Sequence, residues 1–552
     1  LSGVARYLFV PLAEAVVFAM LASYILSRTL VPTMAMYLLR TKEQHHTGPT
    51  RNPLTHLQRG FERGFEGLRQ AYRGALSTLV RRRMVFIPAF IIVGATVFLL
   101  VPWLGEDFFP NTDSGQFILH FRAKTGTRIE ETARLADLVE DVIRRDIPKA
   151  ELENILDNIG LPVSGINMTH MNSGAIGPAD ADVMVSLAPD HHPTADYVRR
   201  LRADLPARFP GTTFYFLPAD MTTQILNFGL PAPLDIQITG SDIEHNREVA
   251  DSILDRIRMV PGVVDARIQQ RFDYPDLEIN VDRTKALQAS FTERDVATSV
   301  LNALSSSFQT SPMFFLNVRN GVNYTLALMA PQYDEQTLRD LQNMTVTSPN
   351  ARRSAILADF ATIKRSQEMA AVDHYNIRRT VDIYAGVQDR DLGSAGREIT
   401  RIVDAARPHL PRGSFVTVRG QLLTMYGSYQ NLLSGLVFSI VLVYLLIVVN
   451  FQSWLDPFII ITALPAALAG IVLMLFFTHT PLSVPALMGA IMCMGVATAN
   501  SVLVVTFARE RLAVHGDAVR AAIEAGFTRF RPVLMTALAM IIGMVPMSLG
   551  LG

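Results

Sequence analysis

The fold is decided by Gly495-Val-Ala-Thr-Ala-Asn-Ser-Val-Leu-Val-Val-Thr-Phe-Ala-Arg-Glu510. This stretch lies in an apolar span, yet small and polar residues from Ala497 to Ser501 interrupt it. Polar side chains within a bilayer are costly, and they usually face the interior of a helix bundle or an ion path. The stretch therefore predicts a helical membrane protein that transports something, and the surrounding sequence indicates what kind.

Six stretches are long and apolar enough to cross a bilayer, which takes about 20 residues per helix. They are residues 8–39, 84–104, 432–450, 457–477, 483–508 and 531–552. Basic residues gather in two connecting segments, 40–83 and 509–531, and the positive-inside rule places both in the cytoplasm. Counting spans from either segment puts residues 105–431 on the opposite side of the membrane. The sequence therefore predicts a large outside domain between the second and third spans.

The composition and the absence of certain motifs exclude other classes of function. The 552 residues carry a formal net charge of +0 without a patch of interleaved basic and aromatic residues, so nucleic acid is not expected as a partner. The single cysteine, Cys493, rules out an intramolecular disulfide and a multi-cysteine metal site. No HExxH, GxSxG or P-loop pattern supports an enzyme with an outside catalytic domain. Because the chain opens on Leu1, we expect an internal segment of a longer protein.

The outside domain shows two β-α-β repeats. In the first, Phe117, Leu119 and Phe121 alternate with Ile118, His120 and Arg122, as in a strand with one buried face. The remaining predicted elements of this repeat are helices at 128–145 and 194–208 and strands at 152–159, 181–188 and 212–217. A second repeat begins at 234–268 and is completed only at 380–419. The pattern predicts two split β-α-β sandwiches, with residues 273–361 inserted into the second.

Four motifs, in this order and topology, resemble the inner-membrane permease subunit of resistance–nodulation–division (RND) efflux transporters over essentially the whole chain. They are Gly105-Glu-Asp-Phe-Phe-Pro-Asn-Thr-Asp-Ser-Gly115, Asn450-Phe-Gln-Ser-Trp-Leu-Asp-Pro457, Gly495 to Glu510, and Arg529-Phe-Arg-Pro-Val-Leu-Met-Thr536. The resemblance is to the hydrophobe/amphiphile branch, and it covers the last span of the first half and most of the second half. It implies an α-helical transmembrane bundle plus an α+β periplasmic domain with ferredoxin-like porter subdomains.

The resemblance also implies a domain organisation and partners. The expected divisions are a span at 1–40, the last of the first repeat; a cytoplasmic linker with an amphipathic helix at 41–83; a span at 84–104; a first porter subdomain at 105–232; a second porter subdomain at 233–272 and 362–431; a docking subdomain at 273–361; and four spans at 432–552. A homotrimer in the bacterial inner membrane, with a large periplasmic domain, is implied as well. Its partners would be a periplasmic adaptor protein, an outer-membrane channel, lipid and small amphiphilic substrates, without a cofactor.

By the same resemblance the expected driving force is the proton gradient. Thr498, Asn500 and Thr536 are candidates for the proton relay, and Arg529 matches a position tied to the cytoplasmic side of that relay. Ala499 stands where well-studied multidrug members have a lysine, so a relay carboxylate would need another partner. The alternative interpretation is that Asn500 and Thr536 only join helices by hydrogen bonds.

A loop rich in Gly, Pro and Met, residues 160–180, joins two predicted strands. In the family the matching loop separates two substrate pockets, and methionine suits varied apolar ligands because it is flexible and polarizable. The residues expected along the substrate path are Ile159, Leu161, Met168, Met171, Ile176 and Met184. The alternative interpretation places them in the loop surface and the core.

The function predicted from these features is proton-driven efflux of amphiphilic compounds, that is, multidrug export by a transporter that is not an enzyme. Heavy-metal members of the family use three separated methionines for a soft cation. His120 and Ile225 occupy two of those places here, so no metal site is expected. A heavy-metal exporter and a non-transporting receptor or translocation auxiliary remain the alternative functions.

Overall fold

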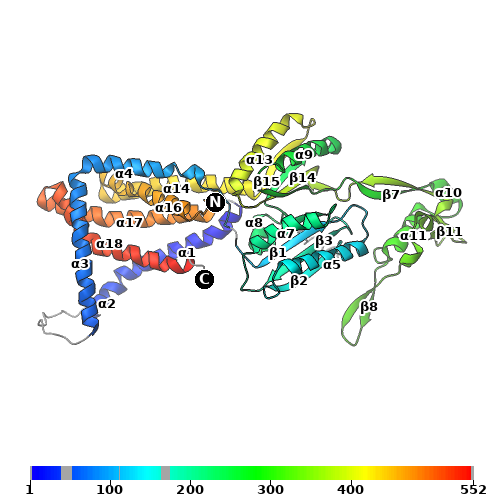
Figure 1. The fold of residues 1–552 in the computed structure, drawn as a ribbon, viewed down its shortest axis with the longest axis horizontal. Coiled ribbons are helices and arrows are strands. Elements are labelled where there is room, and N and C mark those ends of the chain that lie inside the picture. The colour runs from blue at the N-terminus through cyan, green and yellow to red at the C-terminus, as the bar shows by residue number, and fades with distance from the viewer. Residues whose placement is uncertain (1–2, 39–52, 111, 163–173, 549–552) are drawn as a thin grey trace.

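Long helices form a bundle at one end of the molecule, and the sheets lie at the other (Figure 1). This computed structural model describes residues 3–38, 53–110, 112–162 and 174–548. Helix α3 (Pro53–Arg81) runs across the bundle at the end far from the sheets. It is held against α18 (Ala518–Ser548) by stacking of Tyr72 on Phe530, with ring centroids 4.6 Å apart.

Within the described residues, six helical segments are long and apolar enough to cross a membrane. They comprise α1 (Gly3–Arg28), which α2 (Leu30–Leu38) follows; α4 (Arg83–Phe98); α14 (Gln421–Phe451); α15 (Leu455–Ile461) together with α16 (Ala463–Phe477); α17 (Val484–His515); and α18. Each overlaps a predicted span. Helix α17 extends further than predicted, because good helix formers such as Ala513 and Leu512 continue its pattern. It ends where Gly516 adopts a left-handed conformation with φ 67°.

The first sheet is antiparallel, with strand order β2-β3-β1-β4. Its strands are β1 (Gln116–Arg122), β2 (Leu152–Ile159), β3 (Asp180–Leu187) and β4 (Thr213–Leu217), and helices α5 (Ile129–Asp146) and α7 (Thr194–Arg208) contribute to the same hydrophobic core. Leu119 and Phe121 of β1 point into that core, as predicted. The prediction of only one buried face is wrong, because His120 and Arg122 on the opposite face are buried as well.

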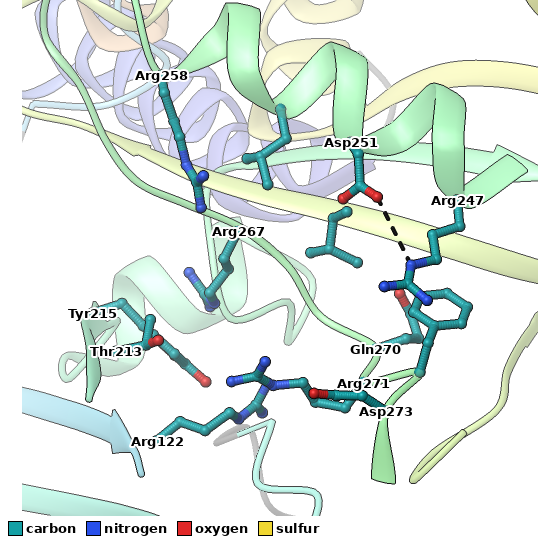
Figure 2. A pocket seen from close by; sticks show the side chains of 13 residues that line it. Arg122, Thr213, Tyr215, Arg247, Asp251, Arg258, Arg267, Gln270, Arg271 and Asp273 are labelled. Atoms are coloured by element: carbon teal, nitrogen blue, oxygen red, sulfur yellow. Dashed lines mark ion pairs between the residues drawn. The ribbon is translucent and has the colours of Figure 1, made fainter. Parts of the chain in front are cut away.

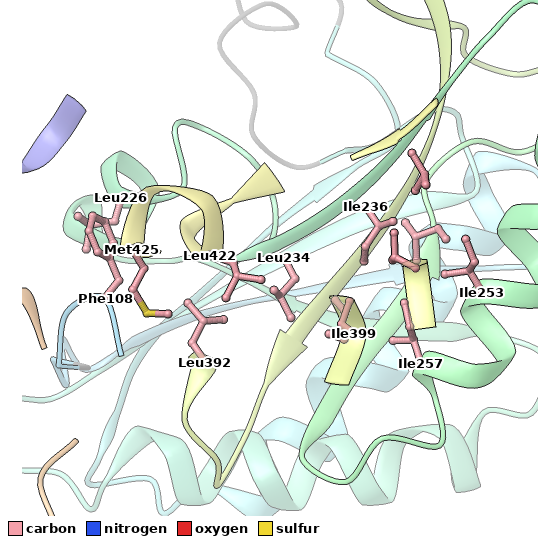
Figure 3. Packing of buried hydrophobic residues seen from close by; sticks show 14 of the residues in the cluster. Phe108, Leu226, Leu234, Ile236, Ile253, Ile257, Leu392, Ile399, Leu422 and Met425 are labelled. Atoms are coloured by element: carbon pink, nitrogen blue, oxygen red, sulfur yellow. The ribbon is translucent and has the colours of Figure 1, made fainter. Parts of the chain in front are cut away.

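The second sheet has β5 (Leu234–Thr239) between β14 (Arg378–Val387) and β15 (Phe415–Gly420). Strands β6 (Val263–Ile268) and β13 (Asp373–Tyr375) also pair with β14, and helices α9 (Ile243–Ile257) and α13 (Leu392–Ala406) pack on the sheet. Buried Leu234 and Ile236 face Ile253 and Ile257 of α9 (Figure 3). The same core continues through Leu422 into α14, so the sheet and the bundle share one hydrophobic interior.

The inserted unit, residues 273–361, is reached through a ribbon of two antiparallel strands, β7 (Tyr274–Val281) and β12 (Ala361–Glu368). It contains α10 (Arg283–Gln288), α11 (Glu293–Ser305), α12 (Leu338–Gln342), the short pair β10 (Thr345–Val346) and β11 (Ala355–Ile356), and a hairpin of β8 (Met313–Asn317) and β9 (Val322–Leu326). Phe291, Val296 and Leu357 belong to a core of its own. The hairpin points away from the rest of the chain (Figure 1) and exposes Phe314 and Phe315.

The Gly105–Phe109 segment connects the bundle to the second sheet. Leu482 accepts a hydrogen bond from the Asp107 amide at 2.9 Å and donates one to the Gly105 carbonyl at 2.7 Å. On the other side, the Glu106 amide donates to Asp391 at 2.9 Å, and the Asp107 carboxylate accepts from the Leu392 amide at 2.7 Å. The segment is therefore bonded both to the start of α13 and to the residues just before α17.

Gly420 ends β15 and begins α14, and its backbone requires glycine. Its φ is 81°, and a Cβ there would collide with the carbonyl oxygen of Pro233. We expect Gly420→Ala to lower the free energy of unfolding by about 1–3 kcal/mol, because it adds backbone strain to a clash with backbone atoms. Thermal unfolding followed by circular dichroism measures this change.

Gly413→Ala is the matched control, since Gly413 has φ 85° but no atom within 4 Å of its added Cβ. It should cost only the strain of the left-handed backbone. Equal losses for the two variants would contradict the assignment of a tight contact at Gly420.

Candidate functional site

A small polar group joins α17 and α18. The Thr536 hydroxyl lies 3.2 Å from Asn500 Oδ1, and it is also within reach of the carbonyls of Pro532 and Val533 in its own helix. Its one proton serves one of these acceptors at a time. Thr498 is buried and donates to carbonyls of its own helix, at Met494 and Gly495, so it does not join this pair.

The pair consists only of neutral groups. Neither α17 from Val484 to Ala508 nor α18 from Pro532 to Pro546 contains Asp, Glu, Lys or Arg. Asn500 is half-buried, whereas Ala499 and Thr536 are exposed on this chain. The arrangement provides a hydrogen bond between two helices. A group that changes its charge must come from outside these two segments.

Arg529 lies at the end of the bundle that is far from the sheets. Its guanidinium stacks over the ring of Phe507 of α17 at 4.8 Å. The neighbouring Arg509 donates to the carbonyl of Phe451 at 3.0 Å and pairs with Asp456 at 3.2 Å. These two arginines connect α18 and α14 to α17, and the structure separates Arg529 from the Thr536–Asn500 pair by about two turns of α18.

The residues predicted along a substrate path do not form one group. Ile159 packs toward the core of the first sheet, while Leu161 is exposed just after β2. Met184 lies on the opposite face of that sheet, the face that carries His120. The Ile176 amide donates to Asp180 at 2.8 Å. Met168 and Met171 lie outside the described residues.

A buried polar network occupies the face of the first sheet that carries His120. The two ring nitrogens of His120 lie 2.6 Å from Asp182 and 3.2 Å from Asp180, and Arg122 donates to Asp180 at 2.5 Å. The His120 ring also stacks on Tyr215 of β4, with centroids 4.4 Å apart. Every nitrogen of this histidine is therefore used within the protein.

Opposing effects act on the pKa of Asp180 in this network. Burial would raise the pKa of its carboxyl, but the hydrogen bond from His120 and the charge of Arg122 together outweigh burial and hold the pKa at about 2. Because this value lies below that of an unfolded aspartate, the network contributes stability above about pH 4 and loses it only as the pH falls toward 2.

A pocket of about 280 Å³ opens beside this network, between the two sheets (Figure 2). Its lining includes Arg122 and Tyr215 from the first sheet and Arg267 from β6. The other lining residues are Thr213, Arg247, Asp251, Leu254, Arg258, Ile268, Gln270, Arg271, Phe272 and Asp273. The guanidinium of Arg267 stacks on the Tyr215 ring at 3.5 Å, so the ring lies between this arginine and His120. The pocket is thus a junction of both sheets, with positive charge in its wall.

A second buried group lies on the second sheet, where Asp235 and Asp382 occupy neighbouring strands. Gln237 and Gln270 each donate to the Asp382 carboxylate, at 3.0 and 2.8 Å. Asp235 Oδ1 has no hydrogen-bond partner among the described residues. Burial, together with the nearby charge of Asp382, raises the pKa of Asp235 to about 8. This carboxyl therefore titrates near neutral pH.

Sequence reasoning missed Arg267, Tyr215 and Asp235. The only signal in the sequence was the position of Asp235 inside an apolar strand, Leu234-Asp-Ile-Gln-Ile-Thr239. Arg267 follows an ordinary strand pattern, and nothing near it indicates that it meets Tyr215, which lies 52 residues earlier.

Among the described residues, six apolar helices long enough to cross a membrane and two larger antiparallel sheets beside them define the fold of a multi-span membrane protein. The chain belongs to the AcrB/AcrD/AcrF family, whose match covers residues 1–552. This is a family of RND efflux transporters, so the recognition made from the motifs is confirmed, as is the expectation of a transporter rather than an enzyme at the level of the family.

Relatives named for different kinds of resistance have similar identities to the chain, and the heavy-metal resistance proteins among them are the stronger matches. It is 26% identical to Protein HelA of Legionella pneumophila, over 100% of this chain and 51% of that protein. It is 25% identical to the cobalt-zinc-cadmium resistance protein CzcA of Cupriavidus metallidurans, over 100% of this chain and 50% of that protein. It is also 25% identical to the multidrug resistance protein MdtC of Yersinia enterocolitica, over 100% of this chain and 51% of that protein. The chain spans about half the length of these relatives.

The fold is similar to that of a heavy metal efflux pump solved by X-ray crystallography. The TM-score is 0.72 at 23% identity, over 88% of this chain and 48% of that chain. The likeness shows a shared fold and does not by itself identify a substrate.

Asp235 gives a test of the buried group in the second sheet. Because its pKa is about 8 in the folded protein and about 4 when unfolded, the unfolded state loses the proton first as the pH rises. Stability should therefore fall between about pH 4 and pH 8. Asp235→Asn should remove this part of the fall, so that the variant gains in melting temperature over the wild type as the pH rises.

Asp255→Asn, at an exposed carboxylate on α9, is the control and should leave the pH dependence unchanged. A melting temperature of Asp235→Asn that runs parallel to that of the wild type from pH 4 to pH 8 would contradict the raised pKa.

Proposed function

We propose that the chain is the second-half portion of a proton-driven RND permease that exports amphiphilic organic compounds. The observation that carries this proposal is the pocket between the two sheets, whose wall combines arginines with apolar side chains such as Leu254 and Phe272. Such a lining suits an organic molecule with a polar and an apolar part. It is a poor environment for a metal cation, because like charges repel.

The domain organisation proposed is the one expected from the sequence. The strand order β2-β3-β1-β4, with two helices in one core, supports a ferredoxin-like porter subdomain at 105–232. The second sheet supports another at 233–272 and 362–431. The inserted unit, residues 273–361, would be the docking subdomain, and its projecting hairpin β8–β9 suits contact with another chain. We further propose an inner-membrane homotrimer with a periplasmic adaptor and an outer-membrane channel.

Heavy-metal export is the second candidate, because several of the relatives, such as CzcA, are named for metal resistance. The side chains at the relevant places do not favour it. His120 has both ring nitrogens engaged by aspartates, and Ile225 of α8 (Met221–Leu226) offers no ligand atom. In the part of the chain that the structure describes, no group of three His, Cys, Asp or Glu is placed to hold a metal ion.

The proposed proton route uses the Thr536–Asn500 hydrogen bond between α17 and α18. These neutral groups would orient water or a carboxylate contributed by the other half of the permease. Arg529 would set the charge at the cytoplasmic end of the route, and Thr498 would keep α17 rigid through its bonds to Met494 and Gly495. Ala499, next to Asn500, supplies no charge at the position where a lysine stands in well-studied multidrug members.

The test of the function is tolerance of drug-sensitive cells that lack their own pumps and express the full-length protein. We expect higher tolerance to bile salts, dyes and apolar antibiotics, and loss of that tolerance on adding a protonophore. Tolerance to copper, silver or zinc alone would replace this proposal with metal export. No change for either class of compound would favour the receptor or translocation auxiliary.

Thr536→Ala tests the proton route within the same assay. Loss of its hydroxyl should lower tolerance to amphiphiles at least about tenfold in concentration-response, at an unchanged amount of protein in the membrane, because relay groups act in the rate-limiting proton step. The measurement is growth inhibition together with immunoblotting of membranes.

Thr506→Ala is the matched control on α17, since that hydroxyl bonds only to the carbonyl of Val502 in its own helix. It should retain tolerance. Equal tolerance for Thr536→Ala and the wild type would show that the pair merely joins two helices.

A further inference from the structure

Three hydrogen-bond donors in the wall of the pocket between the sheets have no acceptor. Nε and Nη2 of Arg267 and the hydroxyl of Tyr215 are buried without a partner among the described residues. Arg267 is 6% exposed and Tyr215 is 1% exposed. Buried donors without acceptors are costly, and native proteins retain few of them. All three unsatisfied atoms donate, so the group that would satisfy them is an acceptor.

The positive charge of Arg267 is not neutralised by its neighbours. Its Nη1 donates to the carbonyl of Asp265 at 3.1 Å, but both carboxylate oxygens of Asp265 are taken by Arg202, at 2.9 and 2.7 Å. Its other close contacts are the rings of Tyr215 and Tyr384. Burial lowers the pKa of this guanidinium, as expected for a charge without a matching anion.

The rest of the pocket adds to this imbalance. Five arginines and two aspartates line it among the described residues. One of the aspartates, Asp251, is paired with Arg247 at 3.8 Å (Figure 2). Arg122, Tyr215 and Arg267 lie together at the opposite end of the pocket from that pair (Figure 2). Arg122 is paired with Asp180, so the unmatched positive charge at this end is that of Arg267, and the unsatisfied donors are those of Arg267 and Tyr215.

An apolar wall lies near the charged end. Leu254, Ile268 and Phe272 line the same pocket, and the ring of Phe272 is covered by the guanidinium of Arg247 at 4.7 Å. A volume of about 280 Å³ accommodates a small ring system or a short acyl chain together with a charged head.

A larger cavity, of about 760 Å³, lies nearer the bundle and does not share these properties. Its arginines have carboxylate partners: Arg199 pairs with Asp389 at 2.6 Å, Arg202 with Asp265 at 2.7 Å, and Arg390 with Glu398 at 2.6 Å. Of these two cavities, the pocket between the sheets is the one that contains an arginine, Arg267, whose buried donors lack acceptors among the described residues.

We propose that this pocket binds the anionic head of an amphiphilic substrate, a carboxylate or a phosphate-type oxyanion, on Arg267 and Tyr215, with the apolar part of the substrate against Leu254 and Phe272. The proposal rests on the proposed function, and it narrows the substrate class to organic anions. Arginine suits this task, because its planar donors match the two oxygens of such a group.

The test is binding of matched ligands to the purified full-length protein by isothermal titration calorimetry. The probes are 1-naphthaleneacetate and 1-naphthaleneacetamide, which share ring and shape and differ in charge, with inorganic phosphate as a head group without an apolar part. We expect the acetate to bind at least about tenfold more tightly than the amide, since hydrogen bonds to charged groups are the stronger ones. Phosphate should bind more weakly than the acetate.

Arg267→Met should abolish the preference for the acetate without lowering the melting temperature, because it removes a buried charge that has no partner. Tyr215→Phe, which deletes only the hydroxyl, should reduce the preference partially. Arg256→Ala is the control, since this arginine is exposed on α9 and does not line the pocket. It should bind both probes as the wild type does.

Equal affinity for acetate and amide, or an unchanged preference in both Arg267→Met and Tyr215→Phe, would overturn the proposal. Phosphate that binds as tightly as the acetate would overturn the assignment to an amphiphile. These outcomes are separate from the tolerance assay: cells that gain protonophore-sensitive tolerance, with a protein that does not distinguish the two probes, would refute the anion site and leave the export function standing.

Discussion

The structure depends on one short segment at the edge of the membrane, Gly105–Phe109. A chain that leaves a bilayer must satisfy its backbone hydrogen bonds where water is scarce. Here the amides and carbonyls of the segment are bonded to residues before α17 on one side and to the start of α13 on the other. The Tyr429 hydroxyl of α14 lies within 2.8 Å of the Asp107 carbonyl, in the same junction. The segment therefore links the second sheet to α14 and α17 through backbone hydrogen bonds together with the carboxylates of Asp107 and Asp391 and the hydroxyl of Tyr429.

Most of the fold follows from patterns within single elements, which is why the sequence could predict it. Alternation identifies strands such as β5, the apolar stripe identifies helices such as α5, and uninterrupted apolar runs identify the spans. The prediction was wrong for β1, where alternation implied a single buried face. His120 and Arg122 look like solvent-facing residues in the sequence, but the polar face of the first sheet is covered by residues of β6 and the segment after it, as when Arg122 donates to the Gln269 carbonyl at 3.2 Å. Burial of one sheet by another depends on tertiary contacts that no local pattern encodes.

The candidate sites divide in the same way. The Thr536–Asn500 contact could be predicted, because both residues lie in apolar spans where a polar side chain is conspicuous, and the structure brings their side chains within 3.2 Å. The pocket between the sheets could not. Its residues come from β1, β4, α9, β6 and the segment after β6, and each is ordinary in its own place. Arg267 differs from the other arginines of the pocket because Asp265, its neighbour on β6, is bound by Arg202 of helix α7. An unmatched charge is a property of the assembled junction.

Charge at the junction of the two sheets bears on the class of cargo that the proposed site would take. The chain is 25% identical both to CzcA and to MdtC, but the metal-resistance relatives match it more strongly, and solved structures similar to it in fold include those of a heavy metal efflux pump. A divalent metal ion about 5 Å from the Arg267 guanidinium would meet a repulsion of roughly 3 kcal/mol per unit charge at an effective dielectric constant of about 20. An organic anion at the same place would gain a comparable attraction, and it would satisfy donors that are otherwise buried without acceptors. The carboxylates on this face of the first sheet, Asp180 and Asp182, are already engaged by His120 and Arg122. The charge at Arg267 is therefore the physical argument on which the proposed organic cargo rests.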